Sequence, residues 1–263
     1  MTFASDNRSK QGANLKSAPP DRKIIAVADA EALARAAADR LMARIADNNG
    51  RIAICLTGGS SPKKLYELLS TEAYRARIPW DRTHWFIGDE RFVPVDDPRN
   101  NMAMARKIFL DAFAPASRIH PIPTGTASPD ESALRYQREL KSFYDADHLD
   151  GARPLFDLVL MGVGPDGHTA SLFPGYPALG ETERWVVGVP QANVEPFVPR
   201  VTLTLPALAS CREMLFELSG APKRAILTQV LKDKNLPASR ARSVGETVFL
   251  VDQAALPEGS GGH

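Results

Sequence analysis

The strongest constraint on the fold is an alternation of short apolar runs with longer amphipathic segments along nearly the whole chain. The run Phe156–Gly164, "FDLVLMGVG", has the composition of a buried strand. The segment Asp29–Gly50 instead repeats apolar residues at helical spacing and stops at Asn-Asn-Gly. Strands that alternate with helices favour a mostly parallel sheet with helices on both faces. The pattern therefore predicts a single doubly wound, Rossmann-like α/β domain.

The same reading places the remaining elements and the domain boundaries. Further strands are expected at residues 23–28, 51–56, 83–88, 184–189, 200–205, 213–220 and 246–252, and helices at 63–70, 101–113, 128–146 and 222–233. Ser128 precedes Glu131 by three residues, which predicts a capping box. No composition break or internal repeat divides the chain, so one domain is expected over 21–256, with a polar, flexible extension at 1–20 and a flexible tail at 257–263.

Charge and composition exclude several classes of partner. The chain has 263 residues, 44% of them hydrophobic, and its 32 basic and 31 acidic residues leave a net charge of +1. This balance gives no general attraction to nucleic acid or to a membrane, so anion binding must be local. No apolar run reaches about 18 residues, and the polar N-terminus does not resemble a secretory signal. With two cysteines and no zinc-site spacing, we expect a soluble, cytoplasmic protein without a metal.

The stretch Gly162–Gly175, "GVGPDGHTASLFPG", is the strongest candidate for chemistry because it leaves a buried strand and presents ionisable groups among four glycines. A neutral imidazole is a natural general base near neutral pH, and Asp166 is placed to orient His168. The alternative is a histidine that only satisfies loop carbonyls. A serine hydrolase is disfavoured, since neither Ser171 nor Ser60 lies in a Gly-x-Ser-x-Gly elbow.

A second loop, "TGGSSP" at Thr57–Pro62, joins an expected strand to an expected helix. Gly58 and Gly59 allow backbone amides to approach a ligand closely, and Ser60 or Ser61 would cap the helix. Helix N-termini favour anions such as phosphate. The alternative is an ordinary capped turn, because the spacing fits neither a Walker loop nor a dinucleotide fingerprint.

Charged residues follow two further expected strands, "THWFIG" and "EMLFELSG", at ends where ligands bind in open α/β sheets, and another opens the expected strand at 200–205. Asp89 and Arg91 lie in "GDERFVP", where Arg91 has the geometry to bind a carboxylate or phosphate. Arg200 and Lys223 follow in "RVTLTLPAL" and "SGAPKRAIL". Each is a surface residue in the alternative reading, and Arg224 could take the role of Lys223.

Together, "LTGGSSP", "GDERFVP", "DLVLMGVGPDGHTASLFPG", "RVTLTLPAL" and "SGAPKRAIL" resemble the motifs of the 6-phosphogluconolactonases, within a wider group that includes glucosamine-6-phosphate deaminases. They occur in the family's order between about Ile24 and Asp252. The resemblance implies hydrolysis of 6-phospho-D-glucono-1,5-lactone in the oxidative pentose phosphate pathway, without a cofactor or an obligatory metal. The expected assembly is a monomer or a weak homodimer.

The resemblance also implies roles for single residues. It makes His168 the general base and Asp166 its companion acid. From the loop itself we expect Thr169 and Ser171 to secure that loop or the helix after it, and in the expected mechanism a loop amide or Arg91 stabilises the oxyanion. The implied substrate-binding residues are Gly58, Gly59 and Ser60 at the phosphate, the pair Asp89 and Arg91, and the phosphate cations Arg200 and Lys223. Where the family commonly has Ser-Asn, this chain has Asn100-Asn101; Asn101 can still cap the next helix, and the role of Asn100 is open.

Two rival functions remain open at this stage. The first is deamination of glucosamine 6-phosphate. Deaminases of this group typically read Asp-Gly-His-Ile-Ala-Phe-Asn-Glu-Pro, but this chain has no glutamate after "DGHTA". They also tend to have Asp-Glu-Tyr, where this chain has Arg91 in place of the tyrosine. A catalytically silent sugar-phosphate sensor usually carries a DNA-binding segment, and residues 1–20 are too short and polar for one. The presence of both Asp166 and His168 also favours an enzyme.

Overall fold

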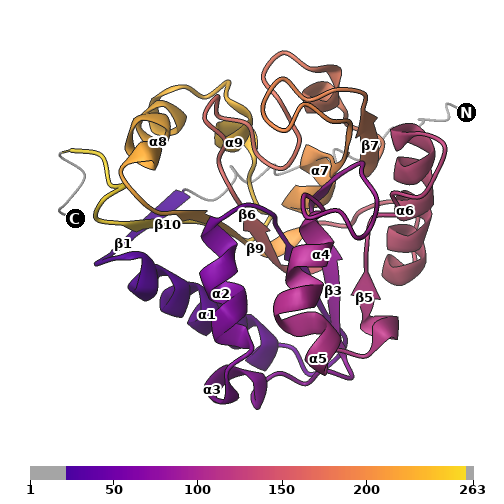
Figure 1. Cartoon of the computed structure of the whole chain (residues 1–263), viewed down its shortest axis with the longest axis horizontal. Helices are drawn as coiled ribbons and strands as arrows, with labels where there is room; N and C mark the ends of the chain where they lie inside the picture. Colours follow the sequence, from indigo (N-terminus) through magenta and orange to yellow (C-terminus); the bar gives the residue numbers. More distant parts are fainter. Residues whose placement is uncertain (1–21, 259–263) are drawn as a thin grey trace, which may run out of the picture.

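The computed structural model describes residues 22–258, so the expected flexible extension 1–20 and all but the first two residues of the expected tail lie outside the described residues. Its centre is a seven-stranded sheet in which every neighbouring pair is parallel. In sheet order the strands are β1 (Arg22–Val27), β10 (Glu246–Asp252), β9 (Cys211–Leu218), β6 (Phe156–Met161), β2 (Ile52–Leu56), β3 (Thr83–Ile87) and β5 (Ile119–His120). Figure 1 shows this sheet, and it confirms the expected fold class.

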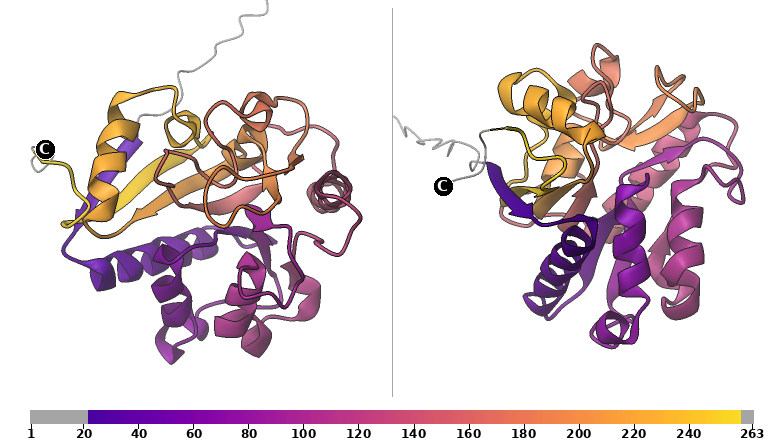
Figure 2. Two further views of the ribbon diagram at one scale, coloured as in Figure 1. Left: turned by 45° about the horizontal axis from the view of Figure 1, so that its top comes forward. Right: turned by 60° about the vertical axis from the view of Figure 1, so that its left-hand side comes forward.

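Helices cover both faces of the sheet, as the two views of Figure 2 show. Successive side chains of a strand point to opposite faces. On β3, Trp85 packs against Phe109 while Phe86 packs against Phe143, with ring centroids 5.2 and 4.8 Å apart. One face therefore carries α1 (Ala30–Ala46), α2 (Ser61–Leu69), α4 (Asn101–Ala105), the π-helical turn η1 (Arg106–Leu110) and α5 (Asp111–Phe113). The other carries α6 (Pro129–Tyr144), α7 (Leu205–Ala209) and α8 (Pro222–Lys232).

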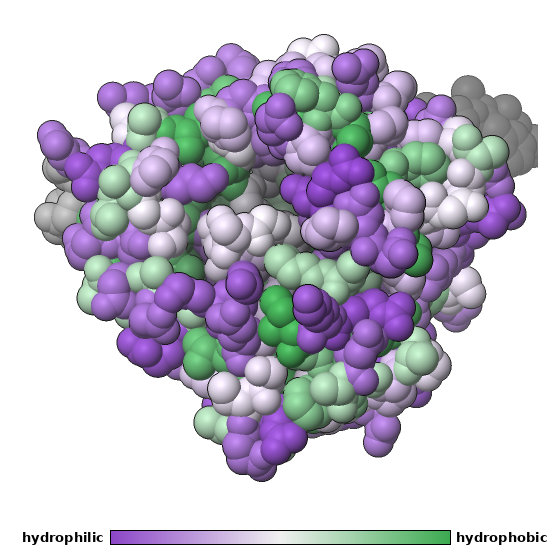
Figure 3. All heavy atoms as spheres, in the orientation of Figure 1, coloured by the Kyte–Doolittle hydropathy of each residue, from purple (hydrophilic) through white to green (hydrophobic). Residues whose placement is uncertain are grey.

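The central strands are buried throughout because of these two helical layers. Every residue of β2, β3 and β6 is buried, which explains why their sequences are mainly apolar and do not alternate with polar residues. The remaining short helices lie in connections: α3 (Glu72–Arg75), η2 (Ala116–Arg118), η3 (Pro177–Gly180) and α9 (Pro237–Arg240). Within residues 22–258 no helix is both long and apolar enough to cross a membrane. On the face drawn in Figure 3, hydrophilic residues are interspersed with hydrophobic ones.

A second, three-stranded antiparallel sheet lies beside the central one. The sequence pattern had not distinguished its strands from those of the central sheet. It consists of β4 (Asp89–Arg91), β8 (Arg200–Leu203) and β7 (Val186–Val189), in that order. Gly88 alone separates β3 from β4, and its carbonyl accepts the backbone N–H of Leu203 at 2.8 Å. In this sheet Arg91 pairs with Arg200, so two distant charged motifs become neighbours.

Two expected helix caps have different outcomes. The Ser128 hydroxyl accepts the backbone N–H of Glu131 at 3.2 Å, which confirms Ser128 as the cap of α6. The Glu131 carboxylate accepts the backbone N–H of Ala127 at 3.1 Å instead of that of Ser128, so the predicted capping box is formed only in part. The expectation that Ser60 or Ser61 caps α2 holds for the position of Ser60 but not for a hydrogen bond of its side chain. Ser60 is the N-cap residue but its side chain makes no cap hydrogen bond, because its backbone is already helical, and Ser61 is the first residue of the helix.

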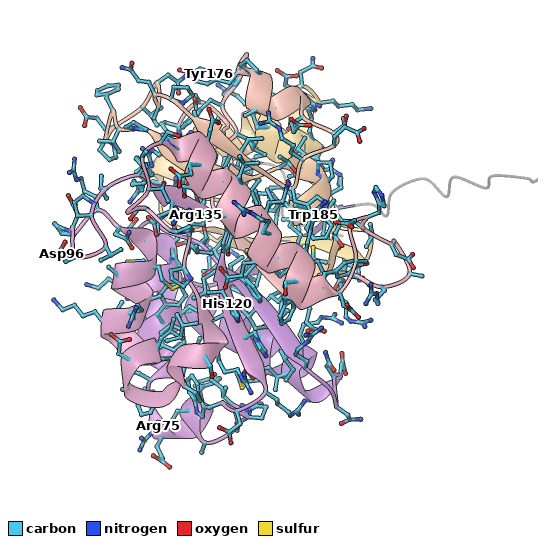
Figure 4. All side chains as sticks on the ribbon, turned by 90° about the vertical axis from the view of Figure 1, so that its right-hand side faces the viewer. Arg75, Asp96, His120, Arg135, Tyr176 and Trp185 are labelled. Atoms are coloured by element: carbon cyan, nitrogen blue, oxygen red, sulfur yellow. The ribbon has the colours of Figure 1, made fainter. Side chains whose placement is uncertain are left out.

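Two of the histidines, the buried His84 and the partly buried His120, form a pair between β3 and β5. His84 Nδ1 lies 2.8 Å from His120 Nε2, and His120 Nδ1 lies 2.6 Å from Glu139 Oε1 on α6. Figure 4 shows His120 close to α6, on which Arg135 is also labelled. Burial and the neighbouring His120 lower the pKa of His84 to about 4. These residues therefore join the sheet edge to α6 rather than contribute to the pocket described next.

Candidate active site

A pocket of about 310 Å³ opens beyond the carboxyl ends of β2, β6 and β9, beside the small sheet. This is where open α/β sheets bind their ligands. Its lining includes eight of the nine site residues expected from the sequence: Gly58, Gly59, Ser60, Asp89, Arg91, His168, Arg200 and Lys223. The ninth, Asp166, lies behind His168 rather than in the wall. The fold therefore gathers five separate sequence motifs around one cavity.

His168 and Asp166 form a tight pair within the loop after β6. His168 Nδ1 lies 2.5 Å from Asp166 Oδ1, and the same oxygen accepts the backbone N–H of His168 at 3.1 Å. Burial opposes ionisation of Asp166, but the hydrogen bonds from His168 outweigh it and lower the pKa of the Asp166 carboxyl. The carboxylate thus favours a proton on Nδ1, which leaves Nε2 as the imidazole nitrogen able to accept a proton.

The shape of this loop depends on a glycine that the sequence reading did not single out. A Cβ added to Gly164 would lie 1.9 Å from Cε1 of His168, so the imidazole lies directly against the Gly164 backbone. The Thr169 hydroxyl donates to the carbonyl of Gly162 at 2.8 Å and closes the turn. Gly162 and Gly164 form a Gly-x-Gly sequence before the histidine. Only the structure shows that the His168 ring lies too close to the second glycine to leave room for a side chain there.

The loop Gly58–Ser60 forms another wall at the start of α2. Its base is fixed by Tyr66, whose hydroxyl donates to the carbonyl of Thr57 at 2.7 Å and accepts its N–H at 3.1 Å. Gly59 has a φ of +96°, which disfavours any residue with a side chain. A helix N-terminus carries N–H groups without helical partners, and such groups attract anions.

Asp89, on β4 of the small sheet, lines the pocket and is buried. Its Oδ2 accepts the hydroxyl of Ser171 at 2.6 Å, and the backbone N–H of Ser171 donates to the Thr202 hydroxyl at 3.2 Å. These contacts connect the loop that carries His168 to both β4 and β8. Ser171 therefore secures the loop, as the sequence analysis anticipated.

The two predicted phosphate cations are held differently. Arg200 is 3% exposed, and its guanidinium donates to the carbonyls of Pro196 and Val198 at 2.8 and 3.3 Å. Lys223 is half-buried, with Nζ 2.6 Å from the carbonyl oxygen of Val163. Burial lowers the pKa of both groups, so a bound anion would favour their charged forms. Arg224 is absent from the lining and instead donates to the carbonyl of Ala254.

Arg91 contributes the remaining charge. Its Nη1 donates to the carbonyl of Arg99 at 2.8 Å, while Nε is buried without a hydrogen-bond partner within residues 22–258. A buried donor without a partner is costly. An oxygen of a bound ligand would satisfy it, which makes Arg91 suited to contact substrate.

The two asparagines at the start of α4 have roles that the sequence reading did not assign to them. The expectation that Asn101 caps the next helix is wrong, because the N-cap of α4 is Asn100, whose side chain accepts the N–H of Ala103 at 2.8 Å. Asn101 instead lines the pocket, and its Nδ2 donates to the carbonyl of Asp89 at 2.9 Å. Sequence alone could not decide this, since either asparagine suits the N-cap position.

Within the described residues no group of three or more His, Cys, Asp or Glu side chains is arranged to hold a metal ion. The fold and the pocket define an α/β protein with a cavity, lined in part by cationic side chains, beyond the carboxyl edge of its sheet. The chain belongs to the family of glucosamine-6-phosphate isomerases and 6-phosphogluconolactonases, whose model matches residues 28–249.

Curated relatives and solved structures agree with this family. The 6-phosphogluconolactonase of Synechocystis sp. is 40% identical over 212 residues, which cover 78% of this chain and 84% of the relative. That of Streptomyces coelicolor is 35% identical over 248 residues, covering 90% and 94%. The structure of 6-phosphogluconolactonase from Trypanosoma brucei has a TM-score of 0.77 and 31% identity, covering 89% of this chain and 97% of that chain.

A more distant structure shows how far the fold extends. A monomeric glucosamine-6-phosphate deaminase has a TM-score of 0.75 at 18% identity, and the match covers 89% of this chain and 98% of that chain. At this identity the likeness establishes a shared fold and nothing about the reaction. The choice between lactone hydrolysis and deamination must therefore come from the pocket and from the closer relatives.

Proposed function

We propose that the chain is a 6-phosphogluconolactonase, which hydrolyses 6-phospho-D-glucono-1,5-lactone to 6-phospho-D-gluconate in the oxidative pentose phosphate pathway. The observation that carries the proposal is the His168–Asp166 pair, which borders the same cavity as two cations and a glycine loop. Relatives named 6-phosphogluconolactonase that are 35–40% identical over most of the chain support it.

Substrate binding follows from the charges of the pocket. The 6-phosphate is held by Arg200 and Lys223 together with backbone amides of the Gly58–Ser60 loop, where the start of α2 adds its dipole. Asp89 accepts a hydrogen bond from a sugar hydroxyl, and Arg91 donates to a ligand oxygen through its unpartnered Nε. These contacts place the lactone carbonyl beside the imidazole of His168.

The reaction then requires one proton carrier. Nε2 of His168 takes a proton from water, and the resulting hydroxide attacks the lactone carbonyl carbon. A loop amide or Arg91 stabilises the oxyanion of the tetrahedral intermediate. When the carbonyl re-forms, the bond to the ring oxygen breaks and the His168 imidazolium returns its proton to that oxygen. Asp166 stays ionised and stabilises the transient imidazolium, as its lowered pKa allows.

One experiment separates this reaction from the family's other one. The purified protein is given the lactone in a hydrolysis assay and glucosamine 6-phosphate in an ammonia-release assay. We expect lactone hydrolysis, and neither ammonia nor fructose 6-phosphate from the amino sugar, since no glutamate follows "DGHTA" at the deaminase position. Efficient deamination without lactone hydrolysis would overturn the proposal, and binding without either reaction would indicate a sensor.

We also propose the setting in which the enzyme works. Residues 21–256 act as one domain in the cytoplasm, as a monomer or a weak homodimer. Cys55 and Cys211 are both buried and unpaired, which suits a reducing compartment. Sedimentation over a range of protein concentrations would measure the assembly.

A further inference from the structure

Glu90 stands between two candidate site residues, Asp89 and Arg91, yet its side chain is fully buried. Its carboxylate accepts three backbone N–H groups. Oε1 accepts from Arg91 at 2.9 Å and from Asn101 at 2.6 Å, and Oε2 accepts from Met102 at 2.9 Å. One side chain thus fixes the backbone at both ends of the connection between β4 and α4, residues 91 to 101.

The hydrogen bonds to Asn101 and Met102 explain why a carboxylate is needed here. These two residues begin α4, and the first N–H groups of a helix have no helical acceptor. Because both residues are buried, water does not replace the missing acceptors. Glu90 supplies them, and Asn100 supplies the next one for Ala103. The start of α4 is therefore attached to β4.

Through Asn101, this attachment reaches the glycine loop. The Asn101 carboxamide lies so close to Gly58 that a Cβ there would be 2.0 Å from Oδ1. Its Nδ2 is held by the carbonyl of Asp89. The position of Asn101 consequently limits the position of the Gly58–Ser60 loop, where the substrate phosphate is proposed to bind.

Through Arg91, the attachment reaches the opposite wall. Glu90 Oε1 accepts the backbone N–H of Arg91, and the Arg91 guanidinium donates to the carbonyl of Arg99, just before Asn100. A shift of the α4 start would therefore move the Arg91 side chain and the Gly58 loop together. The His168–Asp166 pair, by contrast, has no hydrogen bond with Glu90, Asn101 or Met102.

We propose that Glu90 is a positioning residue for substrate binding, which holds Asn101 against Gly58 and Arg91 against the pocket wall. The inference rests on the proposed function for the identity of the substrate. It predicts a separation of effects: loss of Glu90 weakens binding of the phosphorylated ligand, whereas the chemistry of His168 continues once the pocket is saturated.

The test compares Glu90→Gln and Glu90→Ala with wild type. The glutamine keeps the size of the side chain but turns an NH₂ group toward one of the three backbone donors, and the alanine removes all acceptors. We expect KM for the lactone, and Kd for 6-phosphogluconate by calorimetry, to rise roughly tenfold or more. We expect kcat to change less than threefold and the acid limb of its pH profile to stay in place, which a general loss of structure would not give.

A matched control exists in the same chain. Glu181 also accepts three backbone N–H groups, from Thr182, Glu183 and Arg184, but it is outside the pocket lining. Glu181→Gln should leave KM, Kd and kcat unchanged.

Asn101→Ala is a second test variant. It removes the side chain that lies against Gly58 and leaves the Glu90 hydrogen bonds to the backbone in place. It should raise KM and Kd as Glu90→Gln does, and it decides the question if the Glu90 variants do not fold.

The outcomes of the two proposals differ. If wild type fails to hydrolyse the lactone, the proposed function fails, while the Kd for 6-phosphogluconate still measures the effect of Glu90. If wild type hydrolyses the lactone and folded Glu90→Gln binds as wild type does, or loses kcat with KM unchanged, the positioning role is wrong. Normal binding by Asn101→Ala would likewise overturn it, and no ligand binding by wild type would overturn both.

Discussion

Oδ1 of Asp166 accepts both the Nδ1–H of the His168 ring, at 2.5 Å, and the backbone N–H of the same residue, at 3.1 Å. A single carboxylate oxygen therefore holds the histidine at two points and fixes the orientation of its ring. The second oxygen, Oδ2, is buried without a hydrogen-bond partner in the described part of the chain. The pair is thus organised around one nitrogen, Nε2, which remains for proton transfer.

This arrangement predicts unequal effects of its two members. His168→Ala should lower kcat by about 10²–10⁴-fold, the usual contribution of a general base. Asp166→Asn should lower it less, because the aspartate orients the imidazole without accepting the proton from water. In wild type the rate should fall at acid pH, since a protonated imidazole has no lone pair to accept a proton. Steady-state kinetics from pH 5 to 9 check this, and a His168→Ala enzyme of near-normal rate would contradict it.

The contact between Gly164 and the imidazole predicts a loss of activity without a change of any polar group. In Gly164→Ala the new Cβ would lie 1.9 Å from His168 Cε1, so the ring must move. We expect kcat to fall roughly 10–100-fold, as misplacement of a catalytic group by about 1 Å can cause. Gly151→Ala is the control, because its Cβ would meet nothing within 4 Å and Gly151 is outside the pocket lining. Equal kinetics for the two variants would show that the ring position does not limit the rate.

Phosphate recognition can be tested on adjacent residues, because Lys223 lines the pocket and Arg224 does not. A charge-assisted hydrogen bond contributes about 1.5–3 kcal/mol, so Lys223→Ala should lower kcat/KM for the phosphorylated lactone roughly 10–150-fold. Unphosphorylated gluconolactone lacks the group that Lys223 is proposed to bind, so kcat/KM for this substrate should fall much less in Lys223→Ala. Arg224→Ala should behave as wild type on both lactones.

Arg200 needs a separate measurement. Its guanidinium donates to the carbonyls of Pro196 and Val198, so Arg200→Ala removes two loop contacts together with a phosphate cation. We expect it to lower the midpoint of thermal unfolding as well as kcat/KM for the phosphorylated lactone. Equal losses of activity on both lactones for Arg200→Ala and Lys223→Ala would mean that these cations do not bind the phosphate.

The sequence predicted those parts of the molecule that depend on local pattern. Apolar runs such as Phe156–Met161 are strands because parallel strands buried on both faces carry no polar alternation. The carboxyl ends of such strands meet at one edge, which is why Gly58, His168 and Lys223 could be assigned to a common pocket before any contact was known.

What the sequence could not supply depends on contacts between distant segments. The sequence assigned no role to Glu90 in "GDERFVP", but β4 belongs to the small sheet, and there the Glu90 carboxyl group meets the start of α4. Asn101 was equally suited to cap the helix, and only its contact with Gly58 shows its actual place. Glu217, in the middle of an apolar strand, gave no sign of how its charge would be accommodated.

The last prediction concerns Glu217 on β9 and the pH dependence of stability. The side chain is 1% exposed, and neither carboxyl oxygen has a hydrogen-bond partner within residues 22–258. Glu213, four residues earlier on the same face, is instead paired with Arg40 and Arg44. Burial raises the pKa of Glu217 from 4.5 to about 8, so this carboxyl is mostly protonated in the folded protein at neutral pH.

The sign of the effect follows from the two pKa values. Because the folded pKa lies above the unfolded one, the folded protein holds this proton to higher pH, and the stability linked to it is complete below about pH 4.5 and lost as pH rises to about 8. Glu217→Gln stays neutral at every pH. The difference in free energy of unfolding between Glu217→Gln and wild type should therefore increase, in favour of the variant, by about 1.4 kcal/mol per pH unit within this window. Above the window the difference should stay constant. Denaturant unfolding of both proteins from pH 4.5 to 9 measures the difference, in which the other titrating groups cancel. Glu213→Gln, which removes one carboxylate partner from both Arg40 and Arg44, should be destabilising at neutral pH. Parallel stability curves for wild type and Glu217→Gln would show that Glu217 ionises in the folded protein as readily as in the unfolded chain.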